Sequence, residues 1–273
     1  MRLRALMELL LFREVRMKKK KVFVRGLLVV IALAALCACA WCVWYIVQYY
    51  QGQSFGKTIR DMGPEPGTEI DLNAERMKIP VDFDKLREIN PDIYAWIEIP
   101  GTDISYAVLH REGDNAFYTS HSEDSAYYSG GSIYSEDYNA ADFSDKMTVL
   151  YGHNLKSGHM FAQLNDFSDA TVFGEHRSIY VYLPDRVLVY EIFAAYPHSN
   201  EHLLATYDFS NRAQFRAYFA EVFATRSMQA QFLDDGMPDF DEHRVLTLST
   251  CYRGDNHQRF LVQGRLIAEI PGK

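Results

Sequence analysis

The chain has 273 residues, which is enough for one sizeable domain with attachments, and its formal net charge at pH 7 is −8. Residues 1–25 carry nine basic and two acidic side chains, so the other 248 residues hold 19 basic against 34 acidic ones, a net charge of −15. Because so acidic a body repels phosphate backbones, the composition argues against nucleic-acid binding.

Residues 26–47 contain no charged side chain and are long enough to cross the hydrocarbon core of a membrane as one helix. Aromatic residues gather between Trp41 and Tyr50, and the basic run RMKKKK precedes the segment. By the positive-inside rule we expect a single-pass anchor at 26–47 in the cell membrane, with residues 1–25 in the cytoplasm and the remainder outside. A buried core helix is the competing interpretation.

Cleavage of this segment and attachment of a lipid to it are alternatives to an intact anchor. ACA at 38–40 resembles a signal-peptidase site, but apolar residues continue to Val47, which favours an uncleaved anchor. LCAC is a poor lipoprotein box that would place a lipid on Cys39. Met1 and Met17 are both possible first residues.

Residues 48–79 are predicted to form an extracytoplasmic stalk, because Gly and Pro break every periodicity there. We expect the folded domain at 80–273, starting with a short helix in DFDKLREINP that Asp82 caps. Eight β-rich runs separated by turn residues then indicate a mainly β barrel or sandwich. These runs are 94–99, 104–109, 131–135, 147–151, 178–183, 187–196, 244–250 and 259–268.

One helix interrupts the strands, within residues 210–233. Its apolar side chains recur at i, i+3, i+4, i+7 and i+8, which predicts an amphipathic helix packed on the core rather than a ligand-binding element. They are Phe215, Tyr218, Phe219, Val222 and Phe223.

The exported part of the chain holds one cysteine, Cys251. Cys37, Cys39 and Cys42 fall in the apolar segment, where a thiol behaves as a small apolar side chain. Cys251 therefore has no intramolecular disulfide partner, which leaves intermolecular pairing, a reactive thiol or an inert core cysteine.

The neighbours of Cys251 favour the reactive thiol. If residues 252–258 join two adjacent antiparallel strands, Cys251 and Arg259 lie at the same end and face each other. A fixed cation beside a thiol favours the thiolate that attacks carbonyls, and a planar guanidinium also stabilises an oxyanion.

A nucleophilic thiol needs an acid/base partner, and His153 stands just past a strand in TVLYGHN. A structural or merely exposed histidine is the plain alternative. His153 and His159 also form a weak candidate metal pair, because no carboxylate or thiol stands at ligand spacing beside them.

YGHN followed by MFAQL, then TLSTC and then Arg259 in RFLVQGRL, resembles the sortases, the membrane-anchored cysteine transpeptidases of Gram-positive envelopes. The resemblance runs from Trp96, through DNAFY and GGSIY, to Ile267, and class B fits best because of the two helices. It implies an eight-stranded β-barrel that needs no metal or other cofactor. Cys251 would be the nucleophile, His153 the acid/base, and Arg259 the substrate-orienting or oxyanion cation.

The resemblance also implies a substrate groove. Asn115 of the N..Y motif, Thr119 and Ser249 of LSTC would line it, and Leu204 would contribute from the segment ahead of the inserted helix. Some class B members carry an Asp two residues after the cysteine. Here Arg253 stands at that position, and Asp255 is only a distant substitute.

A class B sortase would cleave the C-terminal sorting signal of secreted proteins through a thioester. It would pass them to an amine of a cell-wall precursor or to a pilin lysine, from an anchor held in membrane lipid. A secreted cysteine protease that hydrolyses its substrate is one alternative, although papain-like enzymes place Cys before His in the chain. An anchored binding protein with a degenerate site is another.

Overall fold

The computed structural model describes residues 2–65, 67–68, 70–253 and 255–273. The chain forms two compact units, Met1–Tyr50 and Gln51–Lys273. Helix α1 (Arg2–Arg60) makes up the first unit and continues into the second. Within the described residues, α1 is the one helix long and apolar enough to cross a membrane, as expected for the segment at 26–47.

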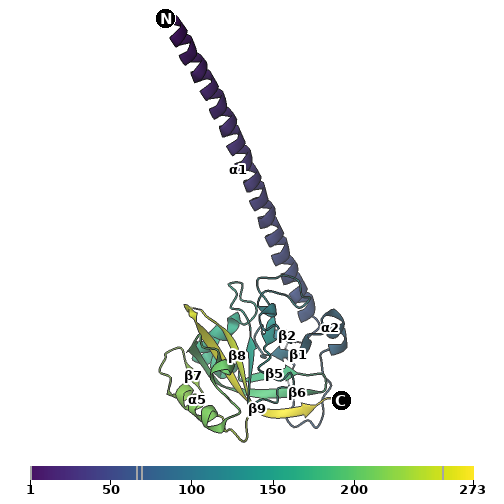
Figure 1. Cartoon of the computed structure of the whole chain (residues 1–273). Coiled ribbons are helices and arrows are strands. Elements are labelled where there is room, and N and C mark those ends of the chain that lie inside the picture. Colours follow the sequence, from purple (N-terminus) through teal and green to yellow (C-terminus); the bar gives the residue numbers. More distant parts are fainter. Residues whose placement is uncertain (1, 66, 69, 254) are drawn as a thin grey trace. The chain divides into compact units, whose positions relative to one another are not determined.

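Eight strands of the second unit close into a barrel (Figure 1). In spatial order they are β5 (Ser178–Tyr182), β1 (Ile93–Glu98), β2 (Ser105–His110), β3 (Ile133–Ser135), β4 (Met147–Tyr151), β8 (Val245–Tyr252), β9 (Asp255–Pro271) and β6 (Arg186–Ser199). Pairing of β6 with β5 closes the ring, so these eight strands leave no long open edge among the described residues. The predicted mainly β, eight-stranded barrel is confirmed, and each predicted run overlaps one strand.

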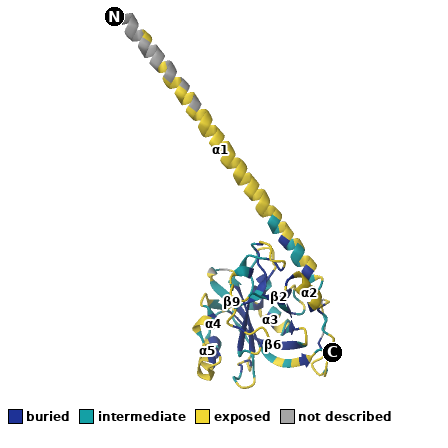
Figure 2. Ribbon diagram, turned by 45° about the vertical axis from the view of Figure 1, so that its right-hand side comes forward, coloured by how far each residue is buried: buried dark blue, intermediate teal, exposed yellow. Residues whose placement is uncertain are grey.

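The two predicted helices are also present. In α2 (Phe83–Ile89), the Asp82 side chain accepts a hydrogen bond from the amide of Lys85 at the N-cap. Asn211 caps α5 (Arg212–Ala224) in the same way, and four of the five expected apolar side chains of α5 are buried. Figure 2 shows the strands largely buried and α5 exposed on its outer side. Both helices therefore pack one apolar face on the barrel.

Several short elements had no clear signal in the sequence. They are η1 (Phe117–Thr119), η2 (Ala162–Ser168), α3 (Ala170–Glu175), α4 (Leu203–Thr206) and β7 (Gln231–Phe232). β7 pairs with β6 beyond the end of β5. Elements this short lack a full period of apolar residues, so periodicity does not reveal them.

The start of the segment expected as an extended stalk is helical, because the last turns of α1 pack on the barrel. Ile59 is 1% exposed in a cluster that includes Leu86 and Trp96, and Phe55 packs against that cluster. The Arg60 Nη2 donates to the Tyr106 hydroxyl at 2.8 Å. Apolar burial thus favours helix through residue 60, and the compact unit begins upstream of the predicted start at residue 80.

Two truncations test this packing. Removal of residues 1–50 is expected to leave the barrel's stability unchanged, whereas removal of residues 1–60 also removes Ile59 from the core. Loss of one such buried side chain costs about 2 kcal/mol of unfolding free energy. Urea unfolding of both fragments measures the difference, and equal midpoints would show that α1 adds nothing to the core.

Glu123 is buried in the β2–β3 connection beneath the last turns of α1. Its side chain is 3.8 Å from where a Cβ of Gly56 would lie, and the residue is 3% exposed. Burial raises the pKa of Glu123 to about 7, against an ordinary value of 4.5; Asp124 adds to the rise and Arg60 opposes it.

This raised pKa predicts a pH-dependent stability. The folded state holds the proton of Glu123 up to about pH 7, whereas the unfolded chain loses it near pH 4.5. Stability therefore falls as the pH rises between these values. Glu123→Gln removes the ionisation, so its melting temperature relative to wild type should be higher at pH 8 than at pH 5. Thermal melts at both values test this, and a constant difference between the two proteins would contradict it.

Candidate active site

Strand β8 carries the cysteine between two neighbours. It pairs in parallel with β4, where Tyr151 lies opposite Ser249, and antiparallel with β9. Cys251 and His153 each follow one of these paired residues by two positions, so the parallel ladder leads both to the same end of the barrel. The segment after β4 stays beside β8, because the Asn154 Nδ2 donates to the carbonyl of Cys251 at 2.9 Å.

Cys251 and Arg259 face each other across the β8–β9 pair, as the sequence predicts. The Arg259 Nη1 donates to the Cys251 Sγ at 2.8 Å, and the thiol is half-buried. The pleat of β9 fixes the direction of the guanidinium toward the sulfur.

His153 is held by the β2–β3 connection. Its Nε2 lies 2.7 Å from the carbonyl oxygen of Thr119. A carbonyl oxygen only accepts hydrogen bonds, so Nε2 carries the hydrogen and Nδ1 is the second functional atom of the ring. Among the residues described, none forms a hydrogen bond with Nδ1, and no group of three or more potential metal ligands includes His153 or His159.

The second nearby arginine faces elsewhere. The Arg253 Nη1 forms an ion pair with Asp166 at 2.8 Å, and its Nη2 donates to the carbonyl of Ala162 in η2. Asp255, the distant substitute for a carboxylate partner, accepts a hydrogen bond from the amide of His257 at 2.8 Å. The geometry therefore joins Arg259, and neither Arg253 nor Asp255, to the thiol.

A small groove of about 70 Å³ begins at Arg259. Ser249 lines it, together with Tyr151, His198 and residues 199–203. Leu203 rather than Leu204 reaches this groove, while Leu204 lines a separate cavity of about 450 Å³. A shift of one residue in a short helix turns a side chain by about 100°.

The other expected groove residues lie along the β2–β3 connection. Thr119 reaches the site through its carbonyl, at His153. The Asn115 Oδ1 accepts a hydrogen bond from the amide of Asp137 at 2.9 Å, so this side chain also fastens the segment after β3.

Sequence reasoning missed a pair of side chains at the groove, in which His202 is a lining residue. The His202 Nε2 lies 2.7 Å from the Glu136 Oε2, and the His202 Nδ1 accepts a hydrogen bond from the amide of Ala205, which caps α4. Burial raises the pKa of Tyr134, which stacks on Tyr151 beside this pair, to about 12. No local pattern reports a contact between residues 66 positions apart.

Comparison with known proteins decides the family. The family model of the sortase domain matches residues 97–267, more than half of the chain. The chain belongs to the sortase family. Its relatives include Sortase B of Listeria monocytogenes, which is 28% identical over 186 residues that cover 67% of this chain and 73% of that protein.

Solved structures agree that this sortase is of class B. The X-ray structure of Clostridium perfringens sortase B has a TM-score of 0.61 and 28% identity, covering 68% of this chain and 100% of that one. The Staphylococcus aureus sortase B–substrate complex has a TM-score of 0.60 and 26% identity, covering 68% and 84%. The predicted class is confirmed. Sortases are cysteine transpeptidases, and Cys251 is this sortase's one cysteine outside α1.

The two arginines of this sortase predict different losses. Arg259→Ala should lower kcat/KM by about 10²–10³, the usual cost of one lost oxyanion donor. Arg259→Lys should recover little, because an ammonium lacks the planar fork. Arg253→Ala should stay within about tenfold of wild type, because its guanidinium binds η2. The turnover of a sorting-signal peptide by all three variants shows which arginine serves the thiol. An inactive Arg253→Ala together with an active Arg259→Ala would assign that role to Arg253.

Proposed function

We propose that this sortase cleaves the C-terminal sorting signal of secreted proteins and transfers them to an amine of a cell-wall precursor or of a pilin lysine. Cys251 is the nucleophile, His153 the acid/base and Arg259 the cation of the site. The observation that carries the proposal is the 2.8 Å contact between the Arg259 guanidinium and the Cys251 Sγ, at the barrel end that also bears His153.

The first half-reaction forms a thioester. The Cys251 sulfur attacks the carbonyl carbon of the scissile bond, a C–S bond forms, and the carbonyl oxygen becomes an oxyanion. Arg259 has five N–H donors, so the guanidinium can hold the sulfur and then the oxyanion. As the C–N bond breaks, His153 gives a proton to the leaving amine.

The second half-reaction reverses the proton transfer. An amine of the acceptor attacks the thioester carbonyl while His153 takes a proton from it, the C–S bond breaks, and a new amide forms. The thiolate is restored beside Arg259. No step needs an oxidant, a reductant or a metal-bound water.

We further propose that the groove between β8 and α4 receives the sorting signal. Ser249 and Leu203 lie on its walls and Arg259 at its reactive end. Thr119 and Asn115 would contact the substrate from the β2–β3 connection, and Leu204 would do so only where the substrate extends into the separate cavity that Leu204 lines. In support, a Staphylococcus aureus sortase B of similar fold is solved as a complex with its substrate.

The anchor suits this task, because substrate tails and lipid-linked precursors both reside at the membrane surface. We propose that residues 1–25 lie in the cytoplasm and that residues 26–47 span the membrane within its lipid. Residues 48–79 would connect the span to the catalytic domain at 80–273, with residues 51–60 packed on the barrel.

A thioester trap tests the function. Wild-type protein incubated with a sorting-signal peptide should gain the mass of the acyl group at Cys251, and an added amine should convert that group to an amide. Cys251→Ala should show neither product while keeping its fold, because Ala retains most of the apolar volume. The matched control replaces Cys37, Cys39 and Cys42 with Ala and should react like wild type.

The other outcomes separate the alternatives. Hydrolysed peptide without any amide, at high amine concentration, would identify a cysteine protease. Absence of a thioester in wild type would identify a binding protein. Cleavage by the Cys251→Ala protein would show that another residue is the nucleophile.

A further inference from the structure

The contact between Thr119 and His153 gives η1 a part in the reaction. The carbonyl oxygen of Thr119 accepts the Nε2 hydrogen of His153 at 2.7 Å. In nucleophile–base pairs the base is oriented by a third group, often a carboxylate. Among the described residues no carboxylate hydrogen-bonds to His153, and the position of a possible one is occupied by Arg253, which binds Asp166.

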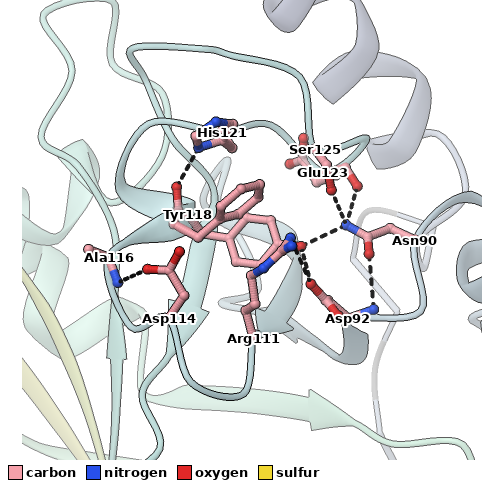
Figure 3. Close-up of polar contacts among 10 residues, drawn as sticks. Asn90, Asp92, Arg111, Asp114, Ala116, Tyr118, His121, Glu123 and Ser125 are labelled. Carbon is pink, nitrogen blue, oxygen red and sulfur yellow. Dashed lines mark hydrogen bonds and ion pairs between the residues drawn. The ribbon is translucent and has the colours of Figure 1, made fainter.

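The preceding residue, Tyr118, holds this carbonyl in place. Tyr118, the residue before Thr119, is 1% exposed, and its hydroxyl donates to the Asp92 Oδ2 at 2.6 Å. The same hydroxyl accepts a hydrogen bond from the Asn90 Nδ2 at 2.8 Å. Figure 3 shows Asn90 and Asp92, both in the short α2–β1 connection, converging on Tyr118. Burial raises the pKa of Tyr118, which keeps the hydroxyl protonated as a donor.

The side-chain amide of Asn90 also holds the β2–β3 connection on the other side of Thr119. The Asn90 Nδ2 also donates to the carbonyl of Glu123 at 2.8 Å, so one side chain binds the loop on both sides of Thr119. Asn90 is itself fixed, because it ends α2 and its Oδ1 accepts a hydrogen bond from the amide of Asp92. η1 is therefore attached to a rigid corner of the barrel rather than to solvent-exposed chain.

A glycine closes the loop from the opposite side. Gly131 has φ +59°, and a Cβ there would lie 2.5 Å from the carbonyl oxygen of Tyr118 and 2.9 Å from that of Thr119. The amide of Ser132 donates to the carbonyl of Tyr118 at 3.0 Å. The backbone at residues 131–132 thus packs closely against the carbonyls of Tyr118 and Thr119, and only glycine fits at position 131.

We propose that Tyr118 and Gly131 are positioning residues that hold the Thr119 carbonyl where it orients His153. The carbonyl fixes the Nε2–H tautomer, so His153 exchanges the protons of both half-reactions through Nδ1. The inference rests on the proposed role of His153 as acid/base. It places a backbone carbonyl in the orienting position that a carboxylate takes in other sites.

Tyr118→Phe tests the proposal, with Tyr182→Phe as the matched control. Both changes remove one buried hydroxyl that donates to a carboxylate, since the Tyr182 hydroxyl donates to Glu98 at 2.9 Å on the β5–β1 pair. Tyr118→Phe in the full chain should lower kcat at least tenfold with KM within about twofold, while Tyr182→Phe should stay within about twofold in both. Equal losses would reduce Tyr118 to a structural residue and overturn the proposal.

A second readout observes the tautomer itself. In detergent-solubilised full-length protein with ¹⁵N-labelled histidine, the His153 signals are identified by their loss in His153→Gln. Neutral His153 should be in the Nε2–H form in wild type and in Tyr182→Phe, with Nδ1–H form appearing in Tyr118→Phe. A wild-type ring in the Nδ1–H form, or an unchanged ring in Tyr118→Phe, would refute the positioning role. Activity retained by His153→Ala would instead refute the acid/base role.

Substitution of Gly131 tests the proposal independently of Tyr118. Gly131→Ala should lower kcat at least tenfold, because the new Cβ displaces the Thr119 carbonyl. Gly113→Ala is its control in the same β2–β3 connection, with φ +79° and no atom within 4 Å of the added Cβ. It introduces similar backbone strain without the clash and should stay within about threefold. Equal effects of the two substitutions would contradict the proposal; should Gly131→Ala fail to fold, Tyr118→Phe still decides.

Discussion

The register of strand β8 against its two neighbours is the constraint on which the site depends. A shift of one residue against β9 would turn Cys251 away from Arg259, because alternate side chains point to opposite faces. A buried hydrogen bond opposes such a shift. Gln263 of β9 is fully buried, and its Nε2 donates to the hydroxyl of Thr247 on β8 at 2.9 Å. A slipped register would leave both polar groups unpaired in the core, which costs more than the bond itself contributes.

The same polar network connects the inserted segment to the barrel. The Gln263 Oε1 accepts a hydrogen bond from Tyr196 of β6, and the Tyr196 hydroxyl meets that of Tyr218 in α5 at 2.8 Å. α5 is therefore fixed to β6 and β9 by directional bonds as well as by apolar packing, and Gln263 links this network to Thr247 on β8. α4 precedes α5 directly, so this attachment also sets where Leu203 and His202 form the wall of the groove. The inserted segment thus forms one wall of the groove at the Arg259 end of the barrel.

Local patterns predicted the parts of the site that are local in the chain. Strand alternation and a short connection bring Cys251 and Arg259 together, and eight residues of separation leave little freedom. The apolar spacing that predicts α5 works for the same reason. The Thr119–His153 contact gave no such signal, because a backbone carbonyl has the same chemistry in every residue. His202 and Glu136 come into contact only through the tertiary fold. Helix α1 continues past Gly52 and Gly56 because Ile59 is buried among core residues that are distant in the sequence, and no local pattern indicates that contact.

In the proposed site, charge and orientation come from different groups, since among the described residues no carboxylate hydrogen-bonds to His153. A carboxylate near the thiol would compete for the donors of Arg259, since guanidinium binds carboxylate in a bidentate and strong manner. The Thr119 carbonyl has no net charge, so it orients His153 without drawing the guanidinium away from the Cys251 Sγ. Arg253 is engaged elsewhere, because its guanidinium forms an ion pair with Asp166 of η2 at 2.8 Å. In the proposed mechanism, the guanidinium of Arg259 thus stays available for the charge that develops on the substrate.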